Sequence, residues 1–455
     1  MPNPGLIRFK EFSSRPNLIV TSPEALVEVL STRANDYVKP DGLRNFVARI
    51  LGFGLLLSEG DVHKVQRRAS QGFFKPQVLR LTYPVLWEKA KEMVRSLEQG
   101  IEEQSKQTKS MGNAGNFLLS ELSRDITMDF IGLSTMGHDL KSFEDNPDKV
   151  VDNFSELTDP SLLQMVFLVL SVKVPEWMTD PFRWALDPSR LTAKRALRTF
   201  GERMVKERKA LLALNPQASR GNLLDVLIGQ GIFSDEELAD QLVTILGAGH
   251  DTSASTLVWC CYELCRRPDI QQQLRTEIRG AIPSLLDTDA ASWKTLESMP
   301  LLNAIIHEVL RLHPSVPMFT REAIKDTSIL NYPIPKGTRV VICPRALNRL
   351  PEFWGEDADK FVPDRWIDTD ESGERTLNGL GGAPTKYAHI TFSHGNRSCI
   401  GKPIAFIQVR CALAAIFGRF NVELVDEEIP YQPPSFITMK PLESVPFRLT
   451  KVEGW

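Results

Sequence analysis

The chain has 455 residues, of which 42% are hydrophobic and 24% charged, and its formal net charge is -3. This composition is typical of a globular protein that is long enough to bury a large core, and it excludes a disordered chain. A nucleic-acid-binding surface needs a basic stripe, which this charge balance does not provide, so we expect no nucleic-acid partner.

The first residues predict a β-hairpin followed by a helix. The stretches 6–12 and 17–22 alternate in hydrophobicity and are bounded by turn residues. Ser22 and Pro23 then supply an N-cap and a first-turn proline for a helix over 23–31. Residues 1–12 resemble neither a signal peptide nor a membrane span, so we expect no N-terminal membrane anchor in this chain.

Most of the chain from residue 78 to about residue 445 has the 3.6-residue period of helices. The stretches 338–343 and 446–452 are strand candidates. Polar stretches at 104–116, 214–222 and 368–385 read as surface loops, because patterned sequence resumes directly after each. We therefore predict one mainly helical domain with small β-sheets over residues 1–455.

A long helix is predicted over 235–267, capped by Ser234 with Glu237 reaching back from three residues later. Its middle, "LGAGHDTSAST" at 246–256, suits a helix poorly, since each Gly costs about 1 kcal/mol relative to Ala. Two explanations stay open. Either another helix crosses closely here, or a ligand lies against the backbone at Ala248 and Gly249, with Asp251 and Thr252 aimed into the same space.

Glu308 and Arg311 lie three residues apart on one face of a helix that begins near Pro300 and ends before Pro314. Such a pair is usually a solvated salt bridge. Further on, Arg365 stands in "FVPDRW" at 361–366, which on its own reads as a surface turn.

The stretch "FSHGNRSCIG" at 392–401 places Cys399 just before an apolar helix over 402–417. The positive end of a helix dipole stabilises a thiolate, the form that binds metals. Gly395 and Gly401 permit unusual backbone angles and the close approach of a flat ligand. The other five cysteines read as small apolar residues without the spacing of a disulfide framework, which favours a reducing compartment: Cys260, Cys261, Cys265, Cys343 and Cys411.

These stretches together resemble the cytochrome P450 monooxygenases. Residues 392–401 match the heme-thiolate signature FxxGxRxCxG at every fixed position. Glu308 and Arg311 match ExxR, Arg365 falls in FxPxRW, and "AGHDTS" at 248–253 matches the oxygen-activation stretch. All four occur in the family's order, and the resemblance implies the cytochrome P450 fold.

The resemblance implies that Cys399 is the axial thiolate on the iron of heme b, within the heme-binding stretch that includes Phe392, Gly395 and Gly401. Arg397 would pair with a heme propionate. The structural network that positions the cysteine would comprise Glu308, Arg311 and Arg365.

On the other side of the heme, the resemblance implies that Asp251 and Thr252 relay protons to dioxygen and that Gly249 leaves room for it. Further propionate contacts would come from His63 and Arg67, four apart on a helix, and from Arg321. His63 stands where the family often has Trp, so an ordinary polar role stays open for His63 and likewise for Arg321. The two histidines at variable positions of the motifs, His250 and His394, are expected not to be ligands.

Arg397, where many bacterial members have His, points to the eukaryotic microsomal type, and the sequence resembles fungal members. The electrons would then come from NADPH through NADPH-cytochrome reductase, which requires a basic face; the candidates are Lys64, Arg68, Lys75 and Lys402. We expect the protein at the cytoplasmic face of the endoplasmic reticulum or in the cytoplasm. The apolar run 162–170 is too short to span a bilayer but suggests peripheral membrane contact.

The implied reaction inserts one oxygen atom from O2 into an apolar small molecule. Pocket-lining candidates are Ile245, Ala248, Thr252, Val316, Met318 and Phe319, with the segments 41–52 and 435–439. A fungal secondary metabolite, terpenoid or polyketide-derived, is the expected substrate. The alternatives are fatty-acid hydroxylation, a heme-thiolate isomerase or dehydratase that needs no reductase, and a non-catalytic heme-binding protein.

Overall fold

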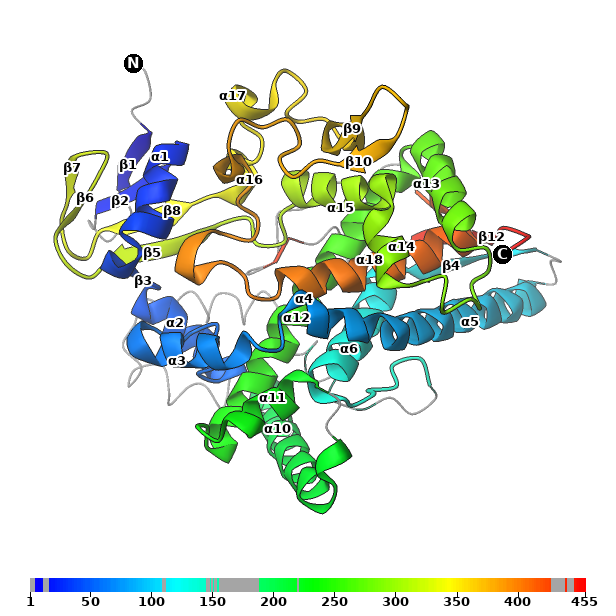
Figure 1. Cartoon of the computed structure of the whole chain (residues 1–455), viewed down its shortest axis with the longest axis horizontal. Helices are drawn as coiled ribbons and strands as arrows, with labels where there is room; N and C mark the ends of the chain where they lie inside the picture. The colour runs from blue at the N-terminus through cyan, green and yellow to red at the C-terminus, as the bar shows by residue number, and fades with distance from the viewer. Residues whose placement is uncertain are drawn as a thin grey trace. The chain divides into compact units, whose positions relative to one another are not determined.

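The computed structural model describes residues 5–10, 16–108, 112–144, 148, 150, 154, 188–218, 221–426, 438–439 and 446–455. These residues are mainly helical with small β-sheets, as predicted (Figure 1). The helices are α1 (Pro23–Val27), α2 (Asp41–Leu51), α3 (Gly60–Ser70), α4 (Pro76–Leu79), α5 (Tyr83–Thr108), α6 (Leu119–Met136), α10 (Pro188–Leu214), α11 (Leu223–Gln230), α12 (Asp235–Cys265), α13 (Pro268–Ala281), α14 (Trp293–Ser298), α15 (Pro300–Leu312), α16 (Pro344–Leu347), α17 (Pro351–Trp354) and α18 (Lys402–Arg419). The strands are β1 (Leu6–Lys10), β2 (Pro16–Val20), β3 (Tyr37–Val38), β4 (Ala114–Leu118), β5 (Phe319–Ala323), β6 (Thr327–Ile329), β7 (Tyr332–Ile334), β8 (Arg339–Ile342), β9 (Ile367–Thr369), β10 (Arg375–Leu377), β11 (Phe420–Leu424) and β12 (Pro446–Lys451).

The chain divides into two compact units. The first comprises Met1–Tyr37, Arg80–Thr127 and Asp251–Trp455, and the second comprises Val38–Leu79 and Met128–His250. Both units are discontinuous in sequence, and α6 and α12 each run from one into the other. The prediction that residues 1–455 form one domain stays a prediction.

The first unit contains a mixed sheet of order β1-β2-β8-β5-β3. The predicted hairpin is confirmed, since β1 and β2 pair antiparallel with Leu6 opposite Val20. β8 then joins β2 in parallel and β5 in antiparallel register. Ala25 and Leu26 of α1 pack with Val20 and Val340 of this sheet in one apolar cluster. The sheet therefore gives α1 and the turn after it a rigid support.

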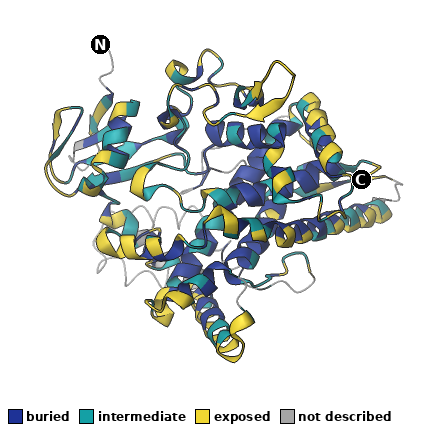
Figure 2. Cartoon of the chain, viewed as in Figure 1, coloured by how far each residue is buried: buried dark blue, intermediate teal, exposed yellow. Residues whose placement is uncertain are grey.

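The first unit also contains a layer of helices around α18. This helix packs against α5, α13 and α15, and most of its side chains from Ile404 to Gly418 are buried (Figure 2). α15 is buried along most of its length as well. A helix that is apolar on all sides must lie in a core. The segment that contains Cys399 thus leads directly into α18, one of the most buried helices of the first unit.

The second unit consists of helices, with α11 packed against both α3 and α10. Asn222 caps α11 by accepting a hydrogen bond from the Asp225 amide at 2.9 Å. The Asp225 carboxylate in turn accepts from the Arg208 guanidinium of α10, at 2.6 Å from Nη2. This nearly buried ion pair links α10 to α11.

The predicted start of α12 is confirmed, and its predicted end is wrong by two residues. Ser234 Oγ accepts from the Glu237 amide at 3.2 Å while the Glu237 carboxylate accepts from the Ser234 amide at 2.8 Å. The helix ends at Cys265 rather than Arg267, because Pro268 begins α13 and disfavours helical geometry at the preceding residue.

No helix in the described part of the chain is both long and apolar enough to cross a bilayer. The apolar run 162–170 lies outside the described residues.

Candidate active site

The Cys399 segment forms a closed loop at the start of α18. Its backbone amide donates to the Phe392 carbonyl at 2.8 Å, which brings the two ends of the signature stretch together. Gly395–Arg397 form a short 3₁₀ turn within this loop, and α18 begins three residues after the cysteine. The predicted position just before a helix N-terminus is therefore confirmed.

Cys399 is the exposed cysteine among the six. Burial raises the pKa of the Cys411 thiol to about 12 and shifts the pKa values of Cys260, Cys261 and Cys265 upward as well. These thiols stay protonated at neutral pH. Cys343 is half-buried, and its thiol donates to the Pro317 carbonyl.

Gly395 holds the loop against a neighbouring turn of the chain. Its φ is +69°, and a Cβ atom there would lie 1.9 Å from the carbonyl oxygen of Leu30. Leu30 belongs to a π-helical turn, Glu28–Thr32, that continues α1 and is closed by the Arg33 amide on the Glu28 carbonyl. The wide turn places a backbone carbonyl directly against the cysteine loop, so only glycine fits at position 395.

Gly401 does not use the unusual backbone angles that glycine permits. Its φ of -80° and ψ of 0° are accessible to any residue, and a Cβ atom would meet Cys399 Sγ at 3.7 Å, an ordinary contact. Gly401 is the N-cap of α18. The close approach of a flat ligand at Gly401 stays a prediction.

We expect Gly395→Ala to lower the free energy of unfolding by at least about 3 kcal/mol, because left-handed strain and a backbone clash add. The measurement is equilibrium urea unfolding. Gly373→Ala is the matched control, since Gly373 also has positive φ, +85°, but nothing lies within 4 Å of its added Cβ. Equal losses for the two variants would show that the contact with Leu30 has no importance.

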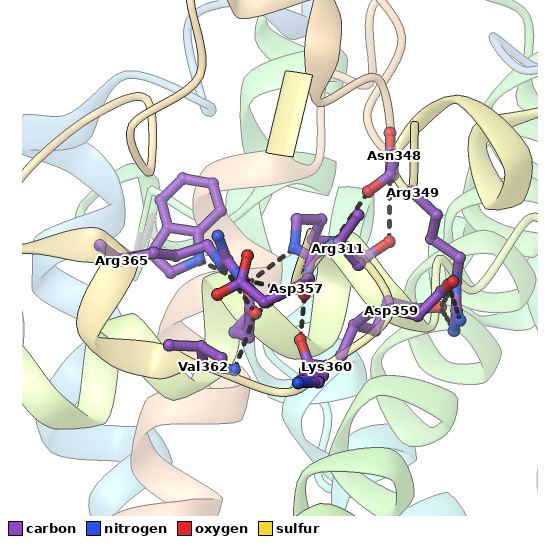
Figure 3. Close-up of polar contacts among 12 residues, drawn as sticks. Arg311, Asn348, Arg349, Asp357, Asp359, Lys360, Val362 and Arg365 are labelled. Carbon is purple, nitrogen blue, oxygen red and sulfur yellow. Dashed lines mark hydrogen bonds and ion pairs between the residues drawn. The ribbon is translucent and has the colours of Figure 1, made fainter. Parts of the chain in front are cut away.

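Glu308 of α15 accepts hydrogen bonds from several sides in a buried ionic network. Figure 3 shows Arg311, Val362 and Arg365 of this network. Glu308 and Arg311 are 0% exposed. Arg311 donates from Nε and Nη2 to the two carboxylate oxygens, both at 2.8 Å. Three further donors complete the shell: Arg365 Nε at 3.0 Å, Trp366 Nε1 at 2.9 Å and the Val362 amide at 2.9 Å. The interpretations of a solvated salt bridge and a surface turn were wrong, because the turn folds over the carboxylate and buries it.

Asn348 connects this network to Ile390 and Thr391, the segment that leads into the cysteine loop. Its backbone carbonyl accepts from Arg311 Nη1 at 3.0 Å. Its side chain donates to Thr391 Oγ1 at 2.8 Å and accepts from the Ile390 amide at 3.0 Å. Thr391 donates in turn to the Leu310 carbonyl at 2.7 Å. Sequence reasoning missed Asn348 and Thr391, which have no local pattern, and also Trp366, although it stands in the quoted "FVPDRW".

One face of α12 is partly exposed where the rest of the helix is buried. Between Gln241 and Cys261 every residue is buried except Ile245, Ala248, Gly249 and Thr252. These four are spaced i, i+3, i+4 and i+7, which places them on one stripe of the helix. The α12 residues expected to line a pocket, Ile245, Ala248 and Thr252, thus share one partly exposed face.

The glycines of α12 allow close packing of neighbouring side chains, at Gly247 and also at Gly249, which belongs to the partly exposed stripe. A Cβ atom at Gly249 would lie 2.6 Å from Ile131 Cδ1 of α6, and one at Gly247 would lie 2.7 Å from Leu51 Cδ2. The close-crossing explanation is therefore confirmed at these two positions. The ligand explanation concerns the exposed stripe and stays a prediction.

Asp251 and Thr252 are held by hydrogen bonds from outside their own helix turn. The Asp251 side chain is buried, and its Oδ2 accepts from Thr438 Oγ1 at 2.7 Å. The Thr252 carbonyl accepts from the hydroxyls of Thr256 and Ser315, both at 2.9 Å. Both residues therefore have fixed surroundings rather than a free helix surface.

The remaining predicted site residues lie in defined elements. His63 is buried and Arg67 half-buried on α3 of the second unit. Arg321 of β5 in the first unit is buried, with its guanidinium 5.0 Å from the Phe319 ring. His250 and His394 are each bonded through a ring nitrogen to a backbone carbonyl. Arg397 lies in the 3₁₀ turn of the cysteine loop. The roles expected for all of these residues stay predictions.

Comparison with known proteins identifies the family. The family model of cytochrome P450 matches residues 8–447. Cytochrome P450 monooxygenase sphH of Aspergillus fumigatus is 35% identical over 465 residues, which cover 100% of this chain and 82% of the relative. Cytochrome P450 monooxygenase buaD of Petromyces alliaceus is 33% identical over 99% of this chain and 83% of its own length. Cytochrome P450 monooxygenase ALT8 of Alternaria alternata is 32% identical over 99% and 84%.

The chain belongs to the cytochrome P450 family. It is an oxygen-incorporating oxidoreductase that uses heme iron, O2, a small-molecule substrate and electrons from a redox partner. The residues of the first unit fit a heme, because an exposed cysteine lies just before the N-terminus of α18, where the helix dipole favours the thiolate that binds iron. The aromatic ring of Phe392 lies in the same loop.

Proposed function

We propose that Cys399 is the thiolate ligand of heme iron and that this chain inserts one oxygen atom into an apolar fungal secondary metabolite. The observation that carries the proposal is the contrast among the six cysteines. Cys399 alone is exposed, and it precedes the N-terminus of α18, where the helix dipole favours a thiolate. Arg397 in the same loop and the buried Arg321 are the propionate partners in the first unit; His63 and Arg67 have that role in the second.

When bound, the heme supplies the activation of dioxygen. The residues of the chain transfer protons and form the surface against which the substrate binds. Asp251 is a buried carboxylate next to Thr252, and the two lie where the exposed stripe of α12 ends. We assign Asp251 the transfer of a proton from solvent and Thr252 the hydroxyl that passes it on. An isomerase or dehydratase would have no need of this pair.

The substrate class follows from the exposed apolar side chains. Ile245 and Ala248 lie on the stripe of α12, and the loop after α15 exposes Val316 and Phe319 partly and Met318 by 61%. Such side chains suit an apolar ligand. We rank a terpenoid or polyketide-derived compound above a fatty acid because the similar proteins are fungal monooxygenases, and fungal members of the family often serve secondary metabolism.

NADPH-cytochrome reductase is the proposed electron donor. In the second unit, α3 and the turn after it expose Lys64, Arg68 and Lys75, a charge pattern that suits an acidic partner. The proposed location is the cytoplasmic face of the endoplasmic reticulum or the cytoplasm. The apolar run 162–170, which we propose touches the membrane, lies outside the described residues.

The first test determines which residue binds the heme iron. Reduced protein with carbon monoxide should show the long-wavelength Soret band of thiolate ligation, and Cys399→Ala should abolish it because the sulfur is gone. Cys343→Ala is the matched control and should keep the band, since Cys343 lies outside the loop. A wild-type band typical of histidine ligation would refute the assignment.

The second test is the substrate class. In a spectral titration of the ferric protein, farnesol or zearalenone should displace iron-bound water and shift the spin state, because both bury apolar surface against α12. Lauric acid should give a much weaker response. A stronger response to lauric acid would make fatty-acid hydroxylation the better proposal.

A further inference from the structure

The two residues Thr438 and Met439 are fixed to α12 and to the loop after α15. The Met439 amide donates to the Ser315 carbonyl at 2.7 Å. The Met439 carbonyl accepts from Ser255 Oγ at 2.6 Å and from Trp259 Nε1 at 2.9 Å. Both Thr438 and Met439 are nearly fully buried, with exposed fractions of 4% and 1%. Three buried hydrogen bonds therefore leave little freedom to the backbone at this point.

This anchored backbone fixes the Thr438 hydroxyl next to Asp251. Thr438 Oγ1 donates to Asp251 Oδ2 at 2.7 Å, and the Asp251 side chain is 8% exposed. A hydroxyl that donates to a buried carboxylate makes a charge-assisted bond, which is stronger than a neutral one. The bond occupies one carboxylate oxygen and so fixes the direction in which the other oxygen points.

The neighbouring alcohol residue is held by the same loop. The Thr252 carbonyl accepts from Ser315 Oγ, and the Ser315 carbonyl accepts from the Met439 amide. Thr256 Oγ1 adds a second hydroxyl to the Thr252 carbonyl and lies 3.1 Å from Ser315 Oγ. The Asp251 carboxylate and the Thr252 backbone are therefore both bonded to the connected segments Thr438–Met439 and Ser315.

We propose that Thr438 is a positioning residue for proton transfer: its hydroxyl holds the Asp251 carboxylate in the orientation that serves Thr252. This inference rests on the proposed function, in which Asp251 and Thr252 move the proton. Thr438 lies in the segment 435–439 expected to line the substrate pocket, yet its hydroxyl is directed to the acid rather than reserved for the substrate. A single side chain thus links the substrate-side segment to the acid.

The experiment removes only the hydroxyl. Thr438→Val keeps the shape of the side chain, and Thr438→Ser restores the donor. In the heme-loaded enzyme with its reductase, the ratio of product to NADPH consumed should fall about tenfold in Thr438→Val, the loss expected for a charge-assisted hydrogen bond. The electrons should appear as hydrogen peroxide, and Thr438→Ser should restore the ratio. The probe is the panel compound with the lowest dissociation constant.

Thr338→Val is the matched control. Thr338 is 1% exposed, and its hydroxyl has no hydrogen-bond partner among the residues that the structure describes, so the same chemical change should leave coupling unchanged. Thr438→Ala is a second variant without the hydroxyl, for use if Thr438→Val impairs folding. It should show the same fall in coupling as Thr438→Val. The dissociation constant of the probe in the spectral titration should change by less than about threefold, since the lost bond is to Asp251 and not to the substrate.

A second measurement of the Thr438–Asp251 bond does not depend on catalytic turnover. In equilibrium unfolding, Thr438→Val should lower the midpoint in the wild-type background but less so in the Asp251→Ala background, because the partner is already lost. Equal effects in both backgrounds, or normal coupling in Thr438→Val, would overturn the inference. The variant Thr252→Ala distinguishes a failure of this inference from a failure of the proposed function. If Thr252→Ala couples NADPH consumption to product as well as the wild type does, the proposed proton route through Thr252 is wrong. If Thr252→Ala is uncoupled but Thr438→Val is coupled, only the role of Thr438 is rejected.

Discussion

The buried carboxylate of Glu308 is the constraint on which the cysteine loop and its surroundings depend. A charged group removed from water loses several kcal/mol of solvation unless its partners replace the hydration shell. Glu308 is 0% exposed and accepts five hydrogen bonds, from Arg311, Arg365, Trp366 and the Val362 amide. Since these donors come from α15 and from the turn at 362–366, the charge is tolerated only when both elements are in place.

The network extends from Glu308 to the sulfur through backbone groups. Arg311 binds the carbonyl of Asn348, whose side chain holds Ile390 and Thr391, and the Phe392 carbonyl then accepts from the Cys399 amide. From another direction, Gly395 rests on the Leu30 carbonyl. The loop is thus held from two elements that are distant in sequence, which limits the movement of Cys399, the proposed heme ligand.

The sequence predicted the parts of this arrangement that depend on local chemistry. The hairpin, the capping of α12 by Ser234 and Glu237, and the place of Cys399 before α18 all follow from residues close together in the chain. Asn348 and Thr438 act through partners 43 and 187 residues away, and no local pattern marks them. The two signature glycines also differ in a way that the sequence does not mark, since Gly395 has a positive φ of +69° and Gly401 a φ of -80°.

The central claim, that the Glu308 network immobilises the cysteine loop, is tested most directly by hydrogen–deuterium exchange of the heme-loaded protein. Asn348→Ala cuts the link while leaving Glu308 and both arginines in place. We predict faster exchange at the amide of Ser393, which donates to the Ile390 carbonyl, and at the amides of Ser398 and Cys399, which donate to carbonyls within the loop. Exchange in β11 should stay unchanged. Unchanged exchange at these three amides would contradict the central claim.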